Sequence, residues 1–213
     1  RFTVVSRIAL QTSVYGKEHD QFDNKFKFIK EFISDPVENF FCRNPFISLP
    51  CDFLFLGHPR RKKMKDGLWW DIYCDPIIDV LKEKYRCTLL ETSYLSTHFA
   101  PPKTTQLKYD DLVRLAGTIC KFPASFMISL SRKDKMIVDE INNHISKRFH
   151  IHIDLRKLIA DTVLRRNSFL PFYMLLLKII RPKIAIVVVG YGNKFFIQAC
   201  KKMSIPVVEL QHG

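Results

Sequence analysis

The sequence predicts an α/β domain in which helices cover both faces of a parallel sheet. Two short and largely apolar runs, residues 184–189 and 205–210, flank a segment whose apolar residues recur at helical spacing. A continuous β-branched run such as 184–189 is typical of a parallel strand that is buried on both faces. Because parallel neighbours need a crossover connection, a strand, a helix and a second strand in this order predict a doubly wound, Rossmann-like sheet.

The same order of elements occurs earlier in the chain. Residues 52–57 and 87–90 form two further strand-like runs. Between them, Asp75 followed by Pro76 favours a helix start with Asp75 as the N-cap. The apolar positions that would share one face of this helix are Ile77, Leu81 and Tyr85. These residues predict a second strand–helix–strand unit.

The middle of the chain predicts helices with mixed apolar and charged faces. They cover residues 109–120, 133–148, 154–165 and 168–180. We expect residues 109–180 to form one face of the domain or a side lobe. The first 50 residues are a candidate peripheral segment, in which only one helix is predicted, near residues 24–33.

Both ends of the sequence suggest a part of a longer protein. The chain begins at Arg1, without an initiator methionine, and it stops at Gly213, just after an apolar run. We expect residues 1–213 to form a single Rossmann-like domain of that protein.

Composition indicates a folded protein with an anionic partner. The chain is 47% apolar and 13% aromatic, which is enough to bury a sizeable core. A formal charge of +13 is consistent with nucleic acid, an anionic membrane surface or a phosphorylated substrate. Charge alone does not choose among these three partners.

Cysteine spacing and hydropathy exclude several classes of protein. The six cysteines include no C-x-x-C pair and no histidine at ligand spacing, so neither a zinc site nor a dense disulfide framework is predicted. We expect reduced thiols, with a bridge between Cys42 and Cys51 as the alternative. The longest apolar stretch, residues 169–180, is too short to span a bilayer.

Candidate functional residues follow the predicted strands, because ligands of open parallel sheets bind outside the carboxyl ends of the strands. Gln211, His212 and Gly213 come directly after the last strand. A neutral imidazole there could accept a proton from a hydroxyl group, and a glycine beside it would let the backbone approach a ligand. An ordinary residue between a strand and a loop is the alternative interpretation of His212.

A second candidate is the turn at residues 190–193, formed by Gly190, Tyr191, Gly192 and Asn193. Two glycines allow a tight turn, and the N-terminus of the next helix, with Asn193 as its N-cap, can face an anion. Phe195 stands where a dinucleotide fingerprint needs its third glycine, which disfavours a nicotinamide enzyme. A turn that needs glycine only for its geometry is the alternative.

The third candidate is the loop at residues 58–65, which begins with His58 and contains Arg60 and Arg61. Five of the six residues from 60 to 65 are basic, so the loop would attract phosphate, diphosphate or acidic lipid headgroups unless it is only a solvated loop. Trp69 and Trp70 favour buried packing over stacking on a sugar ring. The remaining histidines show no companion at catalytic or metal spacing and are interpreted as structural or surface residues: His19, His98, His144, His150 and His152.

Two blocks of the sequence resemble bacterial glycosyltransferases of capsule and lipopolysaccharide biosynthesis with GT-B architecture. The more specific block covers residues 183–193 and 199–213 and ends in Ile-Pro-Val-Val-Glu-Leu-Gln-His-Gly, and the other covers residues 55–61 and 70–76. The resemblance implies two Rossmann-like domains that face each other across a cleft. This chain would be the N-terminal, acceptor-side domain, and the C-terminal donor-binding domain would be absent from it.

The chain is also similar to the glycerophosphate and ribitol-phosphate polymerases of teichoic acid synthesis. In those enzymes a His-Gly pair after a strand of the N-terminal domain carries the proposed base, and His212 matches it. Their Thr-Pro-Leu-Lys-like tail would fall beyond Gly213. On this analogy the turn at 190–193 borders the cleft, and the loop at 58–65 contacts phosphate or membrane.

The expected reaction transfers a sugar from a nucleotide-sugar donor to a glycan or lipid-linked acceptor of a surface polysaccharide. No metal or other cofactor is expected, since GT-B transferases do not need a D-x-D-bound metal and the sequence has no such motif. The basic charge would suit a cytoplasmic protein with peripheral contact to the anionic inner face of the cell membrane.

Three alternatives remain at this point. The first is a polyol-phosphate transferase of the teichoic acid type. The second is a polyanion or nucleic-acid binding module, disfavoured because the basic residues are spread along the chain without an RNP, KH or zinc-finger signature. The third is an inactive scaffold.

Overall fold

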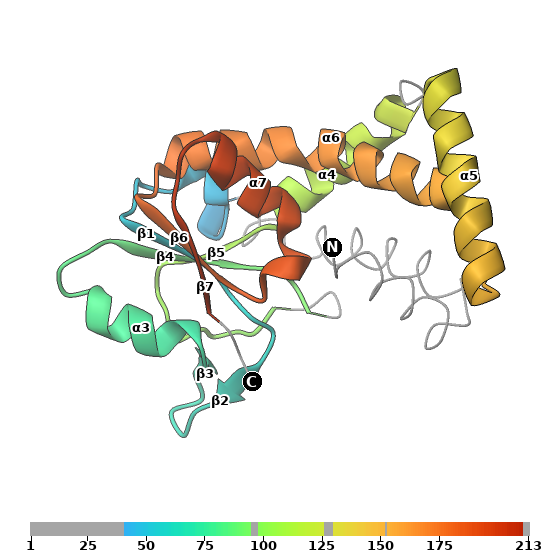
Figure 1. Cartoon of the computed structure of the whole chain (residues 1–213). Helices are drawn as coiled ribbons and strands as arrows, with labels where there is room; N and C mark the ends of the chain where they lie inside the picture. The colour runs from blue at the N-terminus through green and yellow to red at the C-terminus, as the bar shows by residue number, and fades with distance from the viewer. Residues whose placement is uncertain (1–40, 95–97, 126–129, 152, 211–213) are drawn as a thin grey trace. The chain divides into compact units, whose positions relative to one another are not determined.

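The computed structural model describes residues 41–94, 98–125, 130–151 and 153–210. Its centre is a five-stranded sheet in which all neighbouring strands are parallel, in the order β5-β4-β1-β6-β7 (Figure 1). The strands are β1 (Phe53–Leu56), β4 (Cys87–Glu91), β5 (Leu107–Tyr109), β6 (Ile184–Val188) and β7 (Val207–Leu210). This order is that of a doubly wound, Rossmann-like α/β fold, as the apolar runs predicted.

The three central strands are the most apolar parts of the sheet. Phe53 of β1 aligns with Cys87 of β4 on one side and with Ile184 of β6 on the other. Because each of these strands has hydrogen-bonded neighbours and is covered by helices, nearly every residue in it is buried. Their sequences therefore lack the alternation of apolar and polar residues that a half-exposed strand shows.

β7 is not the buried strand that its sequence predicted. Val208 is 46% exposed and Glu209 is exposed as well. Within the described residues, β7 is the last strand on its side of the sheet and pairs only with β6. Its apolar composition predicted the pairing correctly, but a strand with one neighbour buries much less of its surface.

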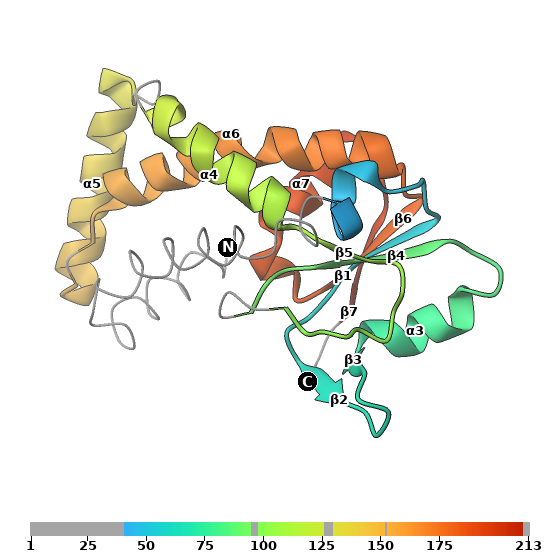
Figure 2. The ribbon, with the colours of Figure 1, turned by 180° about the vertical axis from the view of Figure 1, so that it is seen from behind.

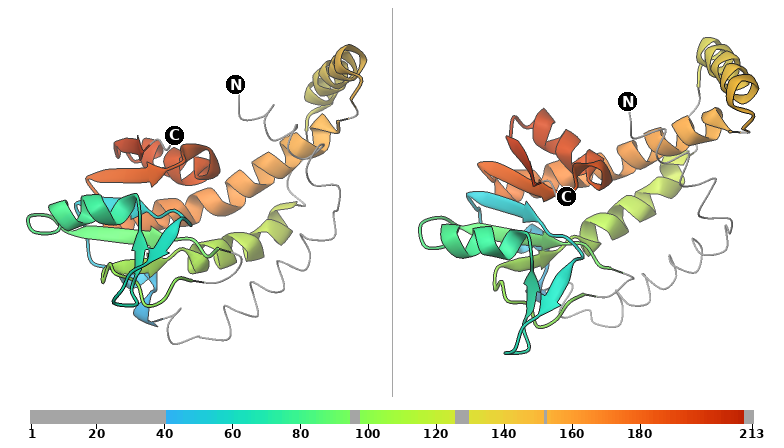
Figure 3. Two further views of the ribbon diagram at one scale, coloured as in Figure 1. Left: turned by 90° about the horizontal axis from the view of Figure 1, so that it is seen from below. Right: turned by 60° about the horizontal axis from the view of Figure 1, so that its bottom comes forward.

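Helices cover both faces of the sheet. They are α3 (Cys74–Leu81), α6 (Leu155–Ile180) and α7 (Lys194–Lys202). On one face, Phe55 and Leu89 form a core cluster with Ile78 of α3. α7, with its buried Phe196 and Ala199, and the last turns of α6 lie on the other face (Figures 1 and 3).

The segment between β1 and α3 is a β-hairpin rather than the open polar loop that the basic run predicted. β2 (Arg61–Lys63) pairs antiparallel with β3 (Trp69–Asp71), and the hairpin projects from the sheet beneath α3 (Figures 1 and 2). At its tip Gly67 has a φ of 86°, which glycine adopts without a steric penalty. An Asp-Gly pair is a hairpin signal. The hairpin at Asp66 and Gly67 was not predicted, because the basic residues before this pair suggested a polar loop.

Residues 113–173 form a second compact unit. It contains most of α4 (Asp111–Ser125), α5 (Arg132–Phe149) and much of α6. The hydroxyl of Ser131 caps α5 by accepting a hydrogen bond from the Asp134 amide at 3.1 Å. A Cβ at Gly117 would lie 2.6 Å from the Phe169 ring, so this close packing requires glycine.

Two helix boundaries differ from the prediction. The segments 154–165 and 168–180 are one helix of 26 residues, α6, with Pro171 in its interior. A proline removes one helix hydrogen bond, but the buried residues around it, such as Leu170 and Leu176, favour continuation. In addition, residues 107–109 are the short strand β5, so the helix expected from 109 begins at Asp111 instead.

All six cysteines are free, including Cys42 and Cys51, for which a bridge was the alternative. Among the described helices, none is both long enough and apolar enough to cross a membrane. The helix expected near residues 24–33 lies outside the described residues.

Candidate functional site

The carboxyl edge of the sheet brings two of the candidate segments together. β1 and β6 are paired up to Leu56 and Val187, so the loop that begins at Gly57 and the turn that begins at Gly190 leave neighbouring strands at the same edge. The chain continues from β1 to β4 on one side and from β6 to β7 on the other. Ligands of open α/β sheets bind at such a switch point, so these loops form the candidate site.

Gly57 allows an arginine to pass close to the backbone. Its amide donates to the Leu90 carbonyl at 2.9 Å, which extends the ladder one residue beyond β1. A Cβ at this position would lie 2.8 Å from Nη2 of Arg61 and 3.2 Å from Oδ2 of Asp71. Glycine is therefore needed here for the close approach of a charged side chain.

His58 and Arg60 form the outer part of this loop. Nδ1 of His58 accepts a hydrogen bond from the Arg60 amide at 3.1 Å, which places the proton of the neutral ring on Nε2. Nη1 of Arg60 donates to the Tyr73 hydroxyl at 3.1 Å, and the His58 and Tyr73 rings meet edge to face at 5.2 Å. Arg60 is exposed, so its guanidinium lies where an anion could reach it.

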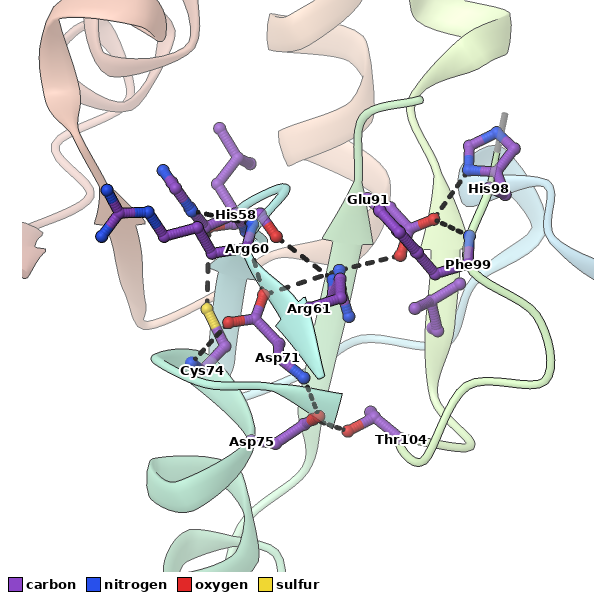
Figure 4. A network of polar contacts seen from close by, with 12 residues as sticks. His58, Arg60, Arg61, Asp71, Cys74, Asp75, Glu91, His98, Phe99 and Thr104 are labelled. Atoms are coloured by element: carbon purple, nitrogen blue, oxygen red, sulfur yellow. Dashed lines mark hydrogen bonds and ion pairs between the residues drawn. The ribbon is translucent and has the colours of Figure 1, made fainter. Parts of the chain in front are cut away.

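Arg61, by contrast, lies inside a network of carboxylates (Figure 4). Its side chain is 1% exposed, its Nη2 lies 2.8 Å from Oε2 of Glu91, and its Nε donates to the His58 carbonyl at 3.1 Å. Neither Nη2 nor Oε2 makes a hydrogen bond of good geometry with the described residues, so we attribute their approach to charge attraction. A phosphate could bind Arg61 only by breaking these ion pairs. Arg61 therefore positions the loop.

Asp71 connects this loop to α3. It is fully buried, and its Oδ2 accepts from the His58 amide at 2.9 Å. Its Oδ1 accepts from the amides of Tyr73 and Cys74, each at 3.0 Å. Asp71 thus caps the start of α3, and the prediction that Asp75 is the N-cap was wrong, because the helix begins at Cys74, two residues before the start at Pro76 that this N-cap implies.

Asp75 is instead a buried acceptor behind Asp71. Its Oδ2 accepts from the Asp71 amide at 2.6 Å, and its Oδ1 accepts from the Thr104 hydroxyl. Burial raises the pKa of Asp75, although both of these hydrogen bonds act in the opposite direction. A continuous set of polar contacts therefore runs from Thr104 through both aspartates to His58.

His98 bridges the end of β4 and the start of α4 in the same network. Its Nδ1 lies 2.8 Å from Oε1 of Glu91, and its Nε2 lies 2.7 Å from Oδ2 of Asp111. The imidazole stacks on Tyr109 with a centroid distance of 3.4 Å and an interplanar angle of 9°. Burial alone would lower the pKa of His98, but the hydrogen bonds to Asp111 and Glu91 outweigh it and raise the pKa to about 9.

His98 is thus a structural residue, one of the two roles expected for it, but its carboxylate partners were not apparent from the sequence. An imidazole that faces two carboxylates donates from both nitrogens, so at neutral pH His98 is a cation that joins the end of β4 to the start of α4 and is not a base. Its partners lie 7 and 13 residues away along the chain, and Glu91 is the last residue of β4, whereas Asp111 is the first residue of α4. Sequence spacing does not show this arrangement, because the sheet brings the three residues together.

The turn after β6 has a strained backbone. Val189 has a φ of 62° and a ψ of 80°, a left-handed conformation that is rare for a β-branched residue. The Gly190 amide donates to Oε1 of Glu209 at 2.7 Å, and a Cβ at Gly190 would lie 3.0 Å from Oε2. Glu209 on β7 therefore holds the turn in place.

The rest of this turn is open. Tyr191 is 69% exposed, and a Cβ on Gly192 would meet nothing within 4 Å. Asn193 occupies the N-cap position of α7 as predicted, but its side chain does not cap the helix. Its Nδ2 donates instead to the Val189 carbonyl at 3.3 Å. The turn thus offers an exposed phenol and accessible backbone next to a helix N-terminus.

Gln211, His212 and Gly213 lie outside the described residues. β7, which they follow, ends at the same edge of the sheet as β1 and β6. In the part of the chain that the structure describes, no group of three His, Cys, Asp or Glu side chains could hold a metal ion.

No family model, curated protein or solved structure matches this chain. The case for a function therefore depends on the geometry of the residues themselves.

Proposed function

We propose that this chain is the acceptor-side, Rossmann-like domain of a GT-B-type glycosyltransferase. The enzyme would transfer a sugar from a nucleotide-sugar donor to a surface polysaccharide such as capsule or lipopolysaccharide. The observation that carries the proposal is the meeting of two glycine-containing segments, at Gly57 and Gly190, on either side of the switch point. A Rossmann-like domain binds its ligand there.

The groups that these two segments expose suit a glycan carried on a phosphate. Arg60 offers an exposed guanidinium, and Tyr191 offers an aromatic ring that is 69% exposed. Guanidinium groups bind phosphate in a bidentate manner, and aromatic rings provide apolar contact area with a polar tip. We assign Arg60, His58 and the turn at 190–193 to binding and Arg61 to positioning.

His212 is the proposed general base. It follows β7 by two residues, and the strand directs the chain toward the edge where the two segments meet. Its neutral imidazole would take the proton of the acceptor hydroxyl as the bond from the acceptor oxygen to the donor sugar forms and the bond from that sugar to the departing nucleoside diphosphate breaks. No step in this scheme requires a metal or another cofactor.

The basic hairpin supports a location at an anionic membrane surface. Lys62, Lys63 and Lys65 are exposed around Met64, which is 37% exposed. Each basic residue near such a surface contributes about 1 kcal/mol of attraction. We propose peripheral contact with the cytoplasmic leaflet, where a lipid-linked acceptor would be available.

The same hairpin also favours the alternative of a polyanion-binding module. This module would bind DNA or heparin through lysines alone, with an affinity that falls steeply with salt. A polyol-phosphate transferase would retain the transferase geometry with CDP-glycerol as the donor.

The decisive experiment measures donor turnover by the full-length natural protein that carries this sequence. A panel of nucleotide sugars and CDP-glycerol would be tested with wild type, His212→Ala, Arg60→Gln and the control His144→Ala. His144 is exposed on α5, so its loss should leave turnover unchanged. We expect one nucleotide sugar to be turned over, with a loss of about 100-fold or more for His212→Ala, as for removal of a general base.

Other outcomes separate the alternatives. Turnover of CDP-glycerol alone would favour the polyol-phosphate transferase. Full activity of His212→Ala would refute the base assignment. The absence of turnover with every donor, together with salt-dependent binding of generic DNA, would favour the polyanion-binding module.

A further inference from the structure

A pocket of about 300 Å³ opens at the opposite, amino edge of the sheet. It lies between the C-terminal half of α3, the start of β4 and the segment that leads into β5. Ile78 and Cys87, which are 3% and 6% exposed, form its apolar floor. None of the residues assigned to the carboxyl edge lines it except Thr104, whose hydroxyl is directed to Asp75.

The rim of this pocket carries an excess of positive charge. Lys82, Arg86 and Lys103 face a single carboxylate, Asp79. The ammonium groups of Lys82 and Lys103 both pair with Asp79, and the Lys82 contact measures 2.7 Å. Three cations and one carboxylate line the pocket, and Asp52 lies beside Arg86 and also pairs with Lys183, so the lining keeps a net positive charge.

Three of the polar side chains around the pocket have no partner among the described residues. They are Arg86, Thr105 and Gln106, for which no side-chain hydrogen bond or ion pair is found there. The backbone of Arg86 is fixed, because its amide donates to Oδ2 of Asp52 at 2.9 Å. A guanidinium, a hydroxyl and an amide thus belong to the lining of the pocket without bonding to one another.

We propose that this pocket binds a small phosphate monoester. The phosphate would bind Arg86, with Gln106 and the lysines nearby, and the apolar part of the ester would rest on Ile78 and Cys87. Guanidinium and amide donors complement phosphate oxygens, and the apolar floor removes a small hydrocarbon or aromatic group from water. The site is separate from the switch point, so it adds a second ligand to the proposed glycosyltransferase and does not depend on that function.

Isothermal titration calorimetry of the full chain with phenyl phosphate tests the proposal. We expect saturable binding to one site, and Arg86→Gln should weaken it by about tenfold or more, the usual effect of losing a charged hydrogen bond. Lys84→Gln is the matched control, because Lys84 is exposed two residues away and does not line the pocket. Gln106→Ala should weaken binding by a smaller factor.

The proposal would be overturned by an equal loss of affinity in Arg86→Gln and Lys84→Gln, which would indicate general attraction to a basic surface. It would also be overturned if millimolar phenyl phosphate gave no saturable heat. Phenol, which lacks the phosphate, should bind at least tenfold more weakly, since the charged contacts supply most of the affinity. Because Arg86 and Lys84 are both exposed, circular dichroism of the two variants should match wild type.

Discussion

The two edges of the sheet differ in how far their charged side chains are paired. At the carboxyl edge, Asp71 and Glu91 are almost completely buried and are neutralised by Arg61 and His98. At the amino edge, the cations outnumber the carboxylates, and Arg86 has no side-chain partner among the described residues. The ion pairs of the carboxyl-edge network therefore hold the loops in place. At the amino edge, an excess of positive charge is available to bind a ligand.

The difference follows from burial. A charge that is removed from water must be paired, because the cost of an unpaired buried ion is several kcal/mol. An exposed charge can stay unpaired, since water solvates it, and exposed ion pairs contribute little. Substitutions at the carboxyl edge should thus act mainly on stability, and those at the amino edge mainly on binding.

The largest effect should come from removing the central cation of the carboxyl edge. Arg61→Met would leave Asp71 and Glu91 buried without their common partner, and we expect the free energy of unfolding to fall by about 3–5 kcal/mol. The neighbouring Arg60→Met removes an exposed guanidinium and should cost less than about 1 kcal/mol. Urea unfolding of both variants measures the difference. Equal costs would show that burial does not separate the two arginines.

The second prediction concerns the pH dependence of stability. The pKa of His98 is raised to about 9 in the folded chain, from an ordinary value of 6.5. The stabilisation is therefore fully present below pH 6.5 and is lost as the pH rises through about 9, and it amounts to at most about 3 kcal/mol. Unfolding free energies measured from pH 6 to pH 10 should fall for wild type and fall less for His98→Asn. Identical slopes for both proteins would contradict the assignment of His98 as a buried cation.

The contrast between the edges was only partly visible in the sequence. Continuous apolar runs predicted four of the five strands, and the glycines at 57 and 190 marked the segments that leave β1 and β6. These features are local, so a short stretch of sequence contains the whole signal. β5 was missed because its three residues, Leu107 to Tyr109, are too few to show a pattern.

The buried network was missed because it is formed by contacts between distant parts of the chain. Glu91 sits at the end of an apolar strand, and nothing near it in the sequence indicates that Arg61 and His98 will meet it. Arg61 itself was a candidate phosphate ligand, with a solvated loop as the alternative, and its burial among carboxylates was not predicted. The pairing of β2 with β3 turns it toward Asp71, while Lys62 and Lys63 stay exposed.

A smaller effect on stability is expected from substituting Gly57, which lets Arg61 lie close to the backbone. Gly57→Ala would place a Cβ 2.8 Å from Nη2 of Arg61 and should destabilise the fold by about 2 kcal/mol, since the guanidinium must shift away from Glu91. Gly192→Ala is the matched control, because a Cβ there meets nothing within 4 Å. Thermal unfolding of the two variants should show a lower midpoint only for Gly57→Ala. An unchanged midpoint for Gly57→Ala would mean that the Arg61 side chain can move away from the new Cβ without loss of stability, despite its burial.

The smallest effect on stability is expected at two residues that lie between the carboxyl-edge network and the pocket. Thr104 and Thr105 are neighbours, but the Thr104 hydroxyl donates to the buried Asp75, whereas Thr105 is exposed at the pocket. Thr104→Val keeps the shape of the side chain and removes one donor, so we expect a loss of about 1 kcal/mol of stability. Thr105→Val should leave stability unchanged and weaken phenyl phosphate binding slightly. If Thr104→Val instead leaves the free energy of unfolding unchanged, the stabilising network ends at Asp75. The segment before β5 would then only line the pocket.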